Sequence, residues 1–94
     1  MSKAQKEITI QNPQGLHARP AALFVQIASK YDATINLIKD QEKVSGKSIM
    51  GILTLGANQN SKIIIQVEGE NAEKILQELE ALLTSPEMIW KKLF

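Results

Sequence analysis

The feature that most constrains the fold of this chain is a change of hydrophobic period between residues 62 and 83. From Lys62 to Glu68 the sequence alternates, with Ile63, Ile65 and Val67 on one face, which is typical of a half-buried strand. Gly69 ends this strand and Asn71 is placed to cap a helix. The apolar residues then recur at helical spacing, at Ala72, Ile75, Leu76, Leu79, Leu82 and Leu83.

The N-terminal part of the chain predicts a strand, a turn and a helix. Glu7–Ile10 alternates between polar and apolar residues, and Gln11–Gly15 contains dense turn-forming residues. A helix is expected from about Ala18 to Lys30. Its apolar stripe is formed by Phe24, Ile27, Ala28 and Tyr31, and its opposite face by Ala22, Gln26 and Ser29.

The middle of the chain predicts a hairpin and a short helix. Thr34–Ile38 and Lys43–Ser45 favour strands and are separated by polar residues. Ser48 precedes the apolar segment Ile49–Leu53, which indicates a short helix capped by the serine. The resulting order, strand, helix, strand, strand, helix, strand, helix, indicates an α+β sandwich in which helices cover one face of a sheet.

Composition narrows the class of function. A chain of 94 residues has room for one core, so we expect a single domain over 1–94 with any site on an open face. Eleven Lys and Arg against ten Asp and Glu, with 4% aromatic residues, argue against nucleic acid. The absence of cysteine excludes disulfides and thiolate metal sites. No segment resembles a signal peptide or a membrane span, so we expect a cytoplasmic monomer without stable membrane insertion.

The residues that carry chemistry surround His17, the only histidine, at the junction between the turn and the first helix. The first turn of a helix has N–H groups without intrahelical partners and a positive dipole end, both of which stabilise an anion. Pro20 has no N–H to lose there, so the N–H groups of Ala18 and Arg19 are expected to point toward a ligand.

A neutral imidazole at this position is a nucleophile, and the guanidinium of Arg19 can neutralise an attached phosphoryl group. These residues therefore predict a phosphoryl acceptor. A solvated or helix-capping histidine is an equal alternative on these residues alone. A hydrolase is disfavoured because no second base, metal cluster or carboxylate pair accompanies His17.

Two segments resemble one known family. The sequence GLHARPA at residues 15–21 resembles the active-site segment of the histidine-containing phosphocarrier (HPr) family of the bacterial sugar phosphotransferase system. Residues 47–57 are similar to the regulatory-serine segment of the same family. The resemblance covers about residues 6–84 and implies an open-faced βαββαβα sandwich with an antiparallel four-stranded sheet.

The resemblance also implies roles and partners. His17 would take a phosphoryl group on Nδ1 from enzyme I and pass it to the IIA domain of a sugar permease, with Arg19 steadying the phosphate. Such a protein is a carrier rather than an enzyme and needs no cofactor or metal. Ser48, besides capping a helix, would be phosphorylated by HPr kinase/phosphorylase and would then engage a catabolite-control transcription factor.

We expect brief docking on a surface beside His17, because the histidine must meet two partners in turn. Short apolar helices often pack into cores, so the alternative is that the apolar residues of this docking surface are buried instead. The expected docking residues are Ala22, Gln26, Ile49, Met50 and Leu53, next to Ala18.

The sequence departs from the family pattern at two places, and two functions other than that of a sugar-system carrier stay open. Ser45–Gly46 makes the entry to the regulatory segment more flexible, and residues 85–94 form an extension whose Ser85–Pro86 start indicates a further helix packed on the domain. One alternative is a paralogue in a nitrogen-type or dihydroxyacetone-type phosphorelay. The other is a regulatory module acting through phospho-Ser48, although the family's regulator-only branch lacks the histidine.

Overall fold

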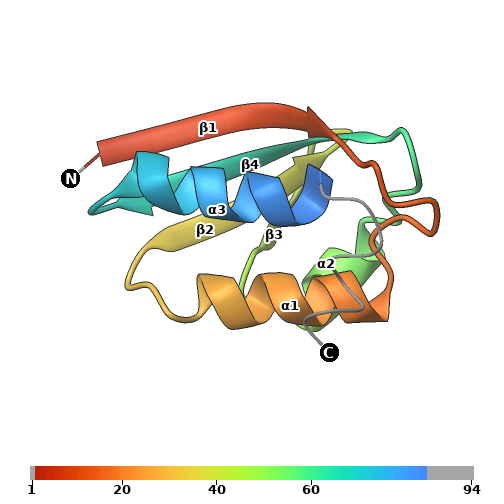
Figure 1. Cartoon of the computed structure of the whole chain (residues 1–94), viewed down its shortest axis with the longest axis horizontal. Coiled ribbons are helices and arrows are strands. Elements are labelled where there is room, and N and C mark those ends of the chain that lie inside the picture. Colours follow the sequence, from red (N-terminus) through yellow and green to blue (C-terminus); the bar gives the residue numbers. More distant parts are fainter. Residues whose placement is uncertain (1, 85–94) are drawn as a thin grey trace.

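The elements follow the predicted order in a computed structural model that describes residues 2–84 (Figure 1). The extension 85–94, with its expected helix start, lies outside the described residues. The elements are β1 (Ser2–Thr9), α1 (Ala18–Ala28), β2 (Thr34–Lys39), β3 (Glu42–Ser45), α2 (Ile49–Thr54), β4 (Lys62–Gly69) and α3 (Ala72–Thr84). The βαββαβα sandwich is confirmed.

The four strands form one antiparallel sheet in the order β1-β4-β2-β3. The helices lie on one side of it (Figure 1), and α3 contacts both β1 and β4 while α1 packs against α2 and α3. Ile63, Ile65 and Val67 of β4 are buried under the helices, as their alternation predicts. The largest fully buried side chains also include Phe24, Ile35, Leu37, Ile52, Ile75, Leu79 and Leu83.

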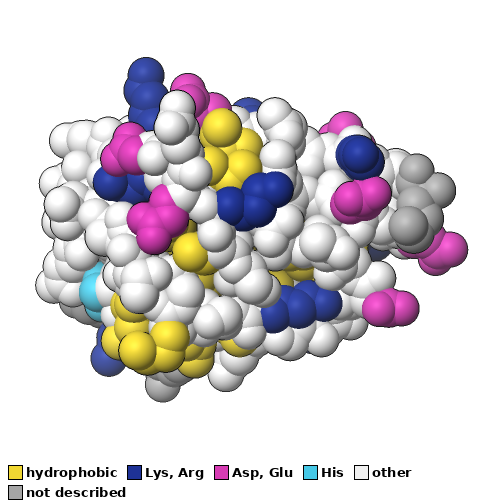
Figure 2. All heavy atoms as spheres, turned by 180° about the vertical axis from the view of Figure 1, so that it is seen from behind, with side chains coloured by type: hydrophobic (Ala, Val, Ile, Leu, Met, Phe, Trp, Pro, Cys, Tyr) yellow, Lys and Arg dark blue, Asp and Glu magenta, His cyan; other side chains and the backbone are white. Residues whose placement is uncertain are grey.

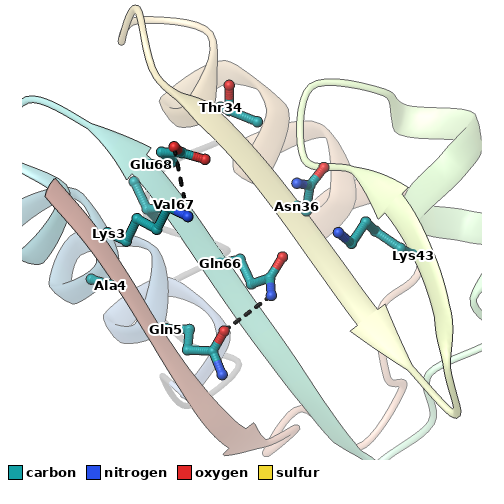
Figure 3. A pocket seen from close by; sticks show the side chains of 9 residues that line it. All are labelled: Lys3, Ala4, Gln5, Thr34, Asn36, Lys43, Gln66, Val67 and Glu68. Carbon is teal, nitrogen blue, oxygen red and sulfur yellow. Dashed lines mark hydrogen bonds and ion pairs between the residues drawn. The ribbon is translucent and has the colours of Figure 1, made fainter. Parts of the chain in front are cut away.

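The sheet face opposite the helices carries polar side chains (Figure 3). Gln5, Gln66 and Asn36 lie side by side on adjacent strands, and Gln66 Nε2 donates to Gln5 Oε1 at 3.0 Å. A shallow pocket of about 310 Å³ lies over this row, between Lys3 and Lys43. None of the predicted site residues lines it, so this pocket does not mark the site around His17.

The two predicted elements near the N-terminus differ in length from those observed. β1 begins at Ser2 rather than Glu7, because its whole length pairs with β4, which runs to Gly69. α1 ends at Ala28 rather than Lys30. After the C-cap residue Ser29, the N–H groups of Lys30 and Tyr31 donate to carbonyls three residues back at 3.1 and 3.2 Å, so the chain tightens into a 3₁₀-type turn.

The predicted hairpin is confirmed, and its turn is shorter than the polar segment suggests. β2 and β3 pair up to Lys39 and Glu42, which leaves only Asp40 and Gln41 in the turn. Both have positive φ, 51° and 71°, the conformation of a two-residue turn that matches the strand twist.

Candidate functional site

A tight turn delivers the chain into α1. The N–H of Gly15 donates to the carbonyl oxygen of Asn12 at 2.9 Å, and the N–H of Gln14 donates to Asn12 Oδ1 at 3.0 Å. Gly15 has a φ of 70°, which glycine adopts without the steric penalty of a side chain. The turn predicted at residues 11–15 is therefore present, and its hydrogen bonds centre on Asn12.

This turn is fastened to the loop that follows α2. The N–H of Leu16 donates to the carbonyl oxygen of Ala57 at 2.8 Å, and Ile10 exchanges backbone hydrogen bonds with Asn60 and Ser61 at 2.9 Å each. Gly15 approaches the same loop so closely that a Cβ at this position would lie 2.4 Å from the oxygen of Ala57. The start of α1 is thus fixed by a segment some forty residues later in the chain.

His17 is the N-cap residue of α1, which confirms its predicted place at the start of a helix. Its backbone is extended, with φ −90° and ψ −171°, and its carbonyl oxygen accepts from the N–H of Ala21 at 3.1 Å. Its side chain makes no capping hydrogen bond, and the first turn holds no acidic residue. The half-buried imidazole is therefore not committed to closing the helix end.

The first helical turn places the other predicted residues beside this imidazole. Ala18 and Arg19 are its first two residues and both are exposed, while Pro20 is third and buried. Backbone N–H groups in a first turn have no hydrogen-bond partner within their helix and form the positive end of the helix dipole. Such a helix start stabilises an anion, and Arg19 is the cationic residue nearest to His17 in the sequence.

Ser48 occupies the corresponding position in α2 and behaves differently. Its backbone is also extended, with φ −121° and ψ 111°, but Oγ accepts from the N–H of Gly51 at 3.0 Å. Its carbonyl accepts from Ile52 N at 3.0 Å. The predicted serine cap is confirmed, and Ser48 is half-buried.

The residues expected to dock partners are only partly exposed. Ile49 and Met50 are 41% and 71% exposed, and no other large hydrophobic side chain in residues 2–84 is exposed. Gln26 is exposed, whereas Ala22 and Leu53 are half-buried and Leu53 packs against the core. Figure 2 shows the imidazole beside a patch of hydrophobic side chains.

Sequence reasoning missed two parts of this site. Asn12 is the only buried polar side chain in residues 2–84, yet in the sequence it was one turn-former among several. The part played by Ala57 depends on a tertiary hydrogen bond, for which an isolated alanine gives no signal.

Residues 2–84 include no group of three or more His, Cys, Asp or Glu side chains placed to hold a metal ion. Over that range, no helix combines the length and apolarity needed to cross a bilayer.

Comparison with known proteins places these features in a family. The family model described as "PTS HPr component phosphorylation site" matches residues 4–85. The phosphocarrier protein HPr of Treponema pallidum is 42% identical over 77 residues, covering 82% of this chain and 88% of its own. The HPr-like protein Crh of Bacillus subtilis is 38% identical over 77 residues, covering 82% and 91%.

A solved structure agrees with the sequence match. The phosphocarrier protein HPr from Bacillus anthracis superposes with a TM-score of 0.83 at 43% identity, covering 88% of this chain and 99% of that one. Because the family model spans nearly all of the described fold, including His17 and Ser48, the match concerns the whole sandwich. This chain belongs to the HPr family of phosphocarrier proteins.

Proposed function

We propose that this protein carries phosphoryl groups between two proteins of a sugar phosphotransferase system. His17 Nδ1 accepts the group from phospho-enzyme I and gives it to the IIA domain of a sugar permease. The observation that carries the proposal is the N-cap of α1, where His17 stands at the helix N-terminus and its side chain makes no capping hydrogen bond.

The local arrangement supports both halves of such a transfer. In each half a P–N bond breaks on the donor histidine and another forms on the acceptor, with attacking and leaving nitrogens roughly in line with phosphorus. His17 is half-buried at the N-cap of α1, and the exposed Ala18 and Arg19 beside it leave this end of the helix open to both partners. The N–H groups of that turn and Arg19 stabilise the dianionic phosphoryl group between the two steps.

We assign docking to the surface beside His17 formed by Ala22, Gln26, Ile49, Met50 and Leu53. Met50 and Ile49 supply its exposed apolar centre. A flexible methionine suits a surface that must fit enzyme I and several IIA domains in turn. Met50→Ser should raise the enzyme I concentration needed for half-maximal transfer, without changing the rate at saturation.

We assign a regulatory role to Ser48. A phosphate on its Oγ would add nearly two negative charges beside the docking surface, at a helix start that tolerates an anion. An acidic partner such as enzyme I would be repelled and a basic one attracted. HPr kinase/phosphorylase and a catabolite-control transcription factor are the partners that this role requires.

A regulatory paralogue is the second candidate function. It is favoured by the 38% identity to the HPr-like protein Crh, close to the 42% identity to an HPr. In that case phosphorylation of Ser48 would be the working modification. A paralogue in a nitrogen-type relay would use His17 in the same way but with another acceptor.

Since phosphoenolpyruvate is made and consumed in the cytoplasm, the carrier function implies that location.

The test is incubation with phosphoenolpyruvate and enzyme I, followed by intact mass measurement before and after mild acid. We expect one added phosphate that is lost in acid and is absent from His17→Ala. Arg19→Ala should accept the group more slowly and lose it faster. Acid-stable, ATP-dependent labelling of Ser48 with no labelling of His17 would refute the carrier and support the regulatory paralogue.

A further inference from the structure

Among residues 2–84, Asn12 alone combines burial, polarity and closeness to His17. It is 2% exposed and lies five residues before His17, in the turn that leads into α1. We propose that Asn12 is a positioning residue: it sets the backbone position of His17 at the start of α1 and therefore the position of the imidazole. The proposal rests on the phosphocarrier function and extends the site beyond the residues that would touch phosphate.

Two hydrogen bonds make Asn12 the organising residue of the turn. Its Oδ1 accepts from the N–H of Gln14 at 3.0 Å and its carbonyl oxygen accepts from the N–H of Gly15 at 2.9 Å. An asparagine side chain that bonds a backbone N–H two residues later imitates a backbone turn. Removal of Oδ1 would leave the Gln14 N–H without this acceptor, and only one of the two hydrogen bonds, from the Gly15 N–H to the Asn12 carbonyl oxygen, would remain.

The orientation of His17 depends on this turn through a short series of contacts. Gly15, held by Asn12, places Leu16 so that its N–H reaches the oxygen of Ala57 at 2.8 Å. The N–H of His17 then donates to the carbonyl oxygen of Gly15 at 3.0 Å. Because the His17 side chain makes no capping hydrogen bond, the position of the imidazole depends on the position of the His17 backbone.

The amide nitrogen of Asn12 separates this role from a contribution to stability. Nδ2 is buried and has no hydrogen-bond partner in residues 2–84, and a buried donor without a partner is destabilising. Asn12 therefore acts on the turn through its oxygen atoms. Serine would replace the whole carboxamide by a hydroxyl, which can still accept from the Gln14 N–H in a turn of the same kind and lacks the nitrogen without a partner.

The consequence for transfer follows from the geometry of the reaction. In-line attack requires the acceptor nitrogen to be placed accurately, and a displacement of about 1 Å lowers rates by roughly 100-fold. Loss of the Asn12 turn would move the backbone that carries His17 without altering any group in contact with phosphate. The effect should therefore appear in the transfer rate at saturating enzyme I rather than in docking.

The experiment compares three variants of the full chain. Asn12→Ala removes the acceptor and Asn12→Ser retains one. Val67→Ala is the stability control, because Val67 is buried in β4 opposite Ala4 and belongs to the sheet rather than to the His17 turn. The measurements are the thermal unfolding midpoint, the saturating rate of transfer from phospho-enzyme I, and residual dipolar couplings of the backbone amides of residues 14–17, below the unfolding transition.

We expect Asn12→Ala to transfer at least about tenfold more slowly and to change the couplings, with Asn12→Ser within about threefold of the wild type. Val67→Ala should transfer normally despite a lower midpoint. A normal rate in Asn12→Ala, unchanged couplings, or an equal loss in Val67→Ala would overturn the proposal. If the wild type accepts no phosphoryl group, the carrier function fails, and unchanged or changed couplings still decide whether Asn12 sets the backbone of His17.

Discussion

The N-terminal ends of α1 and α2 differ in whether a side chain caps the free N–H groups of the first turn. Both begin after a residue with extended backbone, His17 in one case and Ser48 in the other. Ser48 bonds the helix through its hydroxyl, whereas His17 leaves this function unfilled and α1 carries no acidic residue in its first turn. A side chain that closes a helix is occupied, and one that does not is available to a ligand.

The two helices differ in how well each can do without a cap. α2 has six residues and buries only Ile52, so its first turn depends on local hydrogen bonds. α1 has eleven residues and buries five, including Phe24 and Ala28, so packing holds it in place. The helix with the larger buried face can therefore leave its N-terminus open to an anion.

The largest expected effect comes from giving α1 the cap it lacks. His17→Asn should abolish the acid-labile phosphate completely, because asparagine offers no nucleophilic nitrogen. It should also stabilise the protein by about 1 kcal/mol, because asparagine is among the best N-cap residues. Intact mass and urea unfolding measure the two effects. A destabilised variant would mean that the imidazole itself supports the fold, and the contrast with Ser48 would fail.

The next effect tests how tightly each helix end is held by its surroundings. Gly15 and Gly56 both have positive φ, 70° and 63°, but only Gly15 lies against another segment. Gly15→Ala should lose about 2 to 4 kcal/mol through backbone strain and the 2.4 Å contact with Ala57. Gly56→Ala should lose only about 1 kcal/mol, since nothing lies within 4 Å of its added Cβ.

Equal losses in the two glycine variants would contradict this expectation. They would show that the contact between the His17 turn and the loop after α2 yields easily. Urea unfolding with an unchanged slope in both variants is the condition for comparing their free energies of unfolding.

A third effect removes the cap that α2 has. Ser48→Ala should lose about 1 kcal/mol because the N–H of Gly51 loses its acceptor, while Ser48→Asp should remain close to the wild type. Neither substitution should alter the saturating rate of phosphoryl transfer to His17. Thermal unfolding and the transfer assay measure these properties, and a loss of stability in Ser48→Asp equal to that in Ser48→Ala would argue against the capping role.

The sequence allowed the elements with strong local patterns to be predicted. The strand at Lys62–Glu68 and the helix ending near Leu83 were found because each has a regular apolar period. The extra length of β1 escaped because Ser2 to Lys6 contains one buried residue, Ala4, and pairs only because β4 lies beside it. Pairing across the sheet, rather than strand propensity, decides where that strand begins.

The candidate site divides in the same way. His17, Arg19 and Ser48 are recognisable because their residue types and neighbours are local signals. Met50 was predicted to lie on a docking surface beside His17, with burial as the alternative, and it is 71% exposed. Asn12 and Ala57 could not be assigned, because the loop at residues 56–61 reaches the His17 turn only in the folded chain.

The smallest expected effect concerns the anchor of the Ser48 turn. Lys47 Nζ donates to the carbonyl oxygen of Tyr31 at 2.8 Å, and the Tyr31 hydroxyl donates to Glu78 Oε1 in α3. That hydrogen bond, with burial and the charge of Glu78, raises the pKa of Tyr31 above its ordinary value of 10.0. The turn before α2 is thus connected through Tyr31 to α3.

Tyr31→Phe should lower the unfolding midpoint by less than Ser48→Ala does and should leave phosphoryl transfer unchanged. Because the folded chain holds the phenol proton more tightly, the contribution of Tyr31 is fully present below pH 10 and disappears as pH rises through the raised pKa. The wild type and Tyr31→Phe should therefore differ at pH 8 and converge above pH 10 in thermal unfolding. A difference that persists unchanged at high pH would assign the effect to packing of the ring rather than to the hydrogen bond with Glu78.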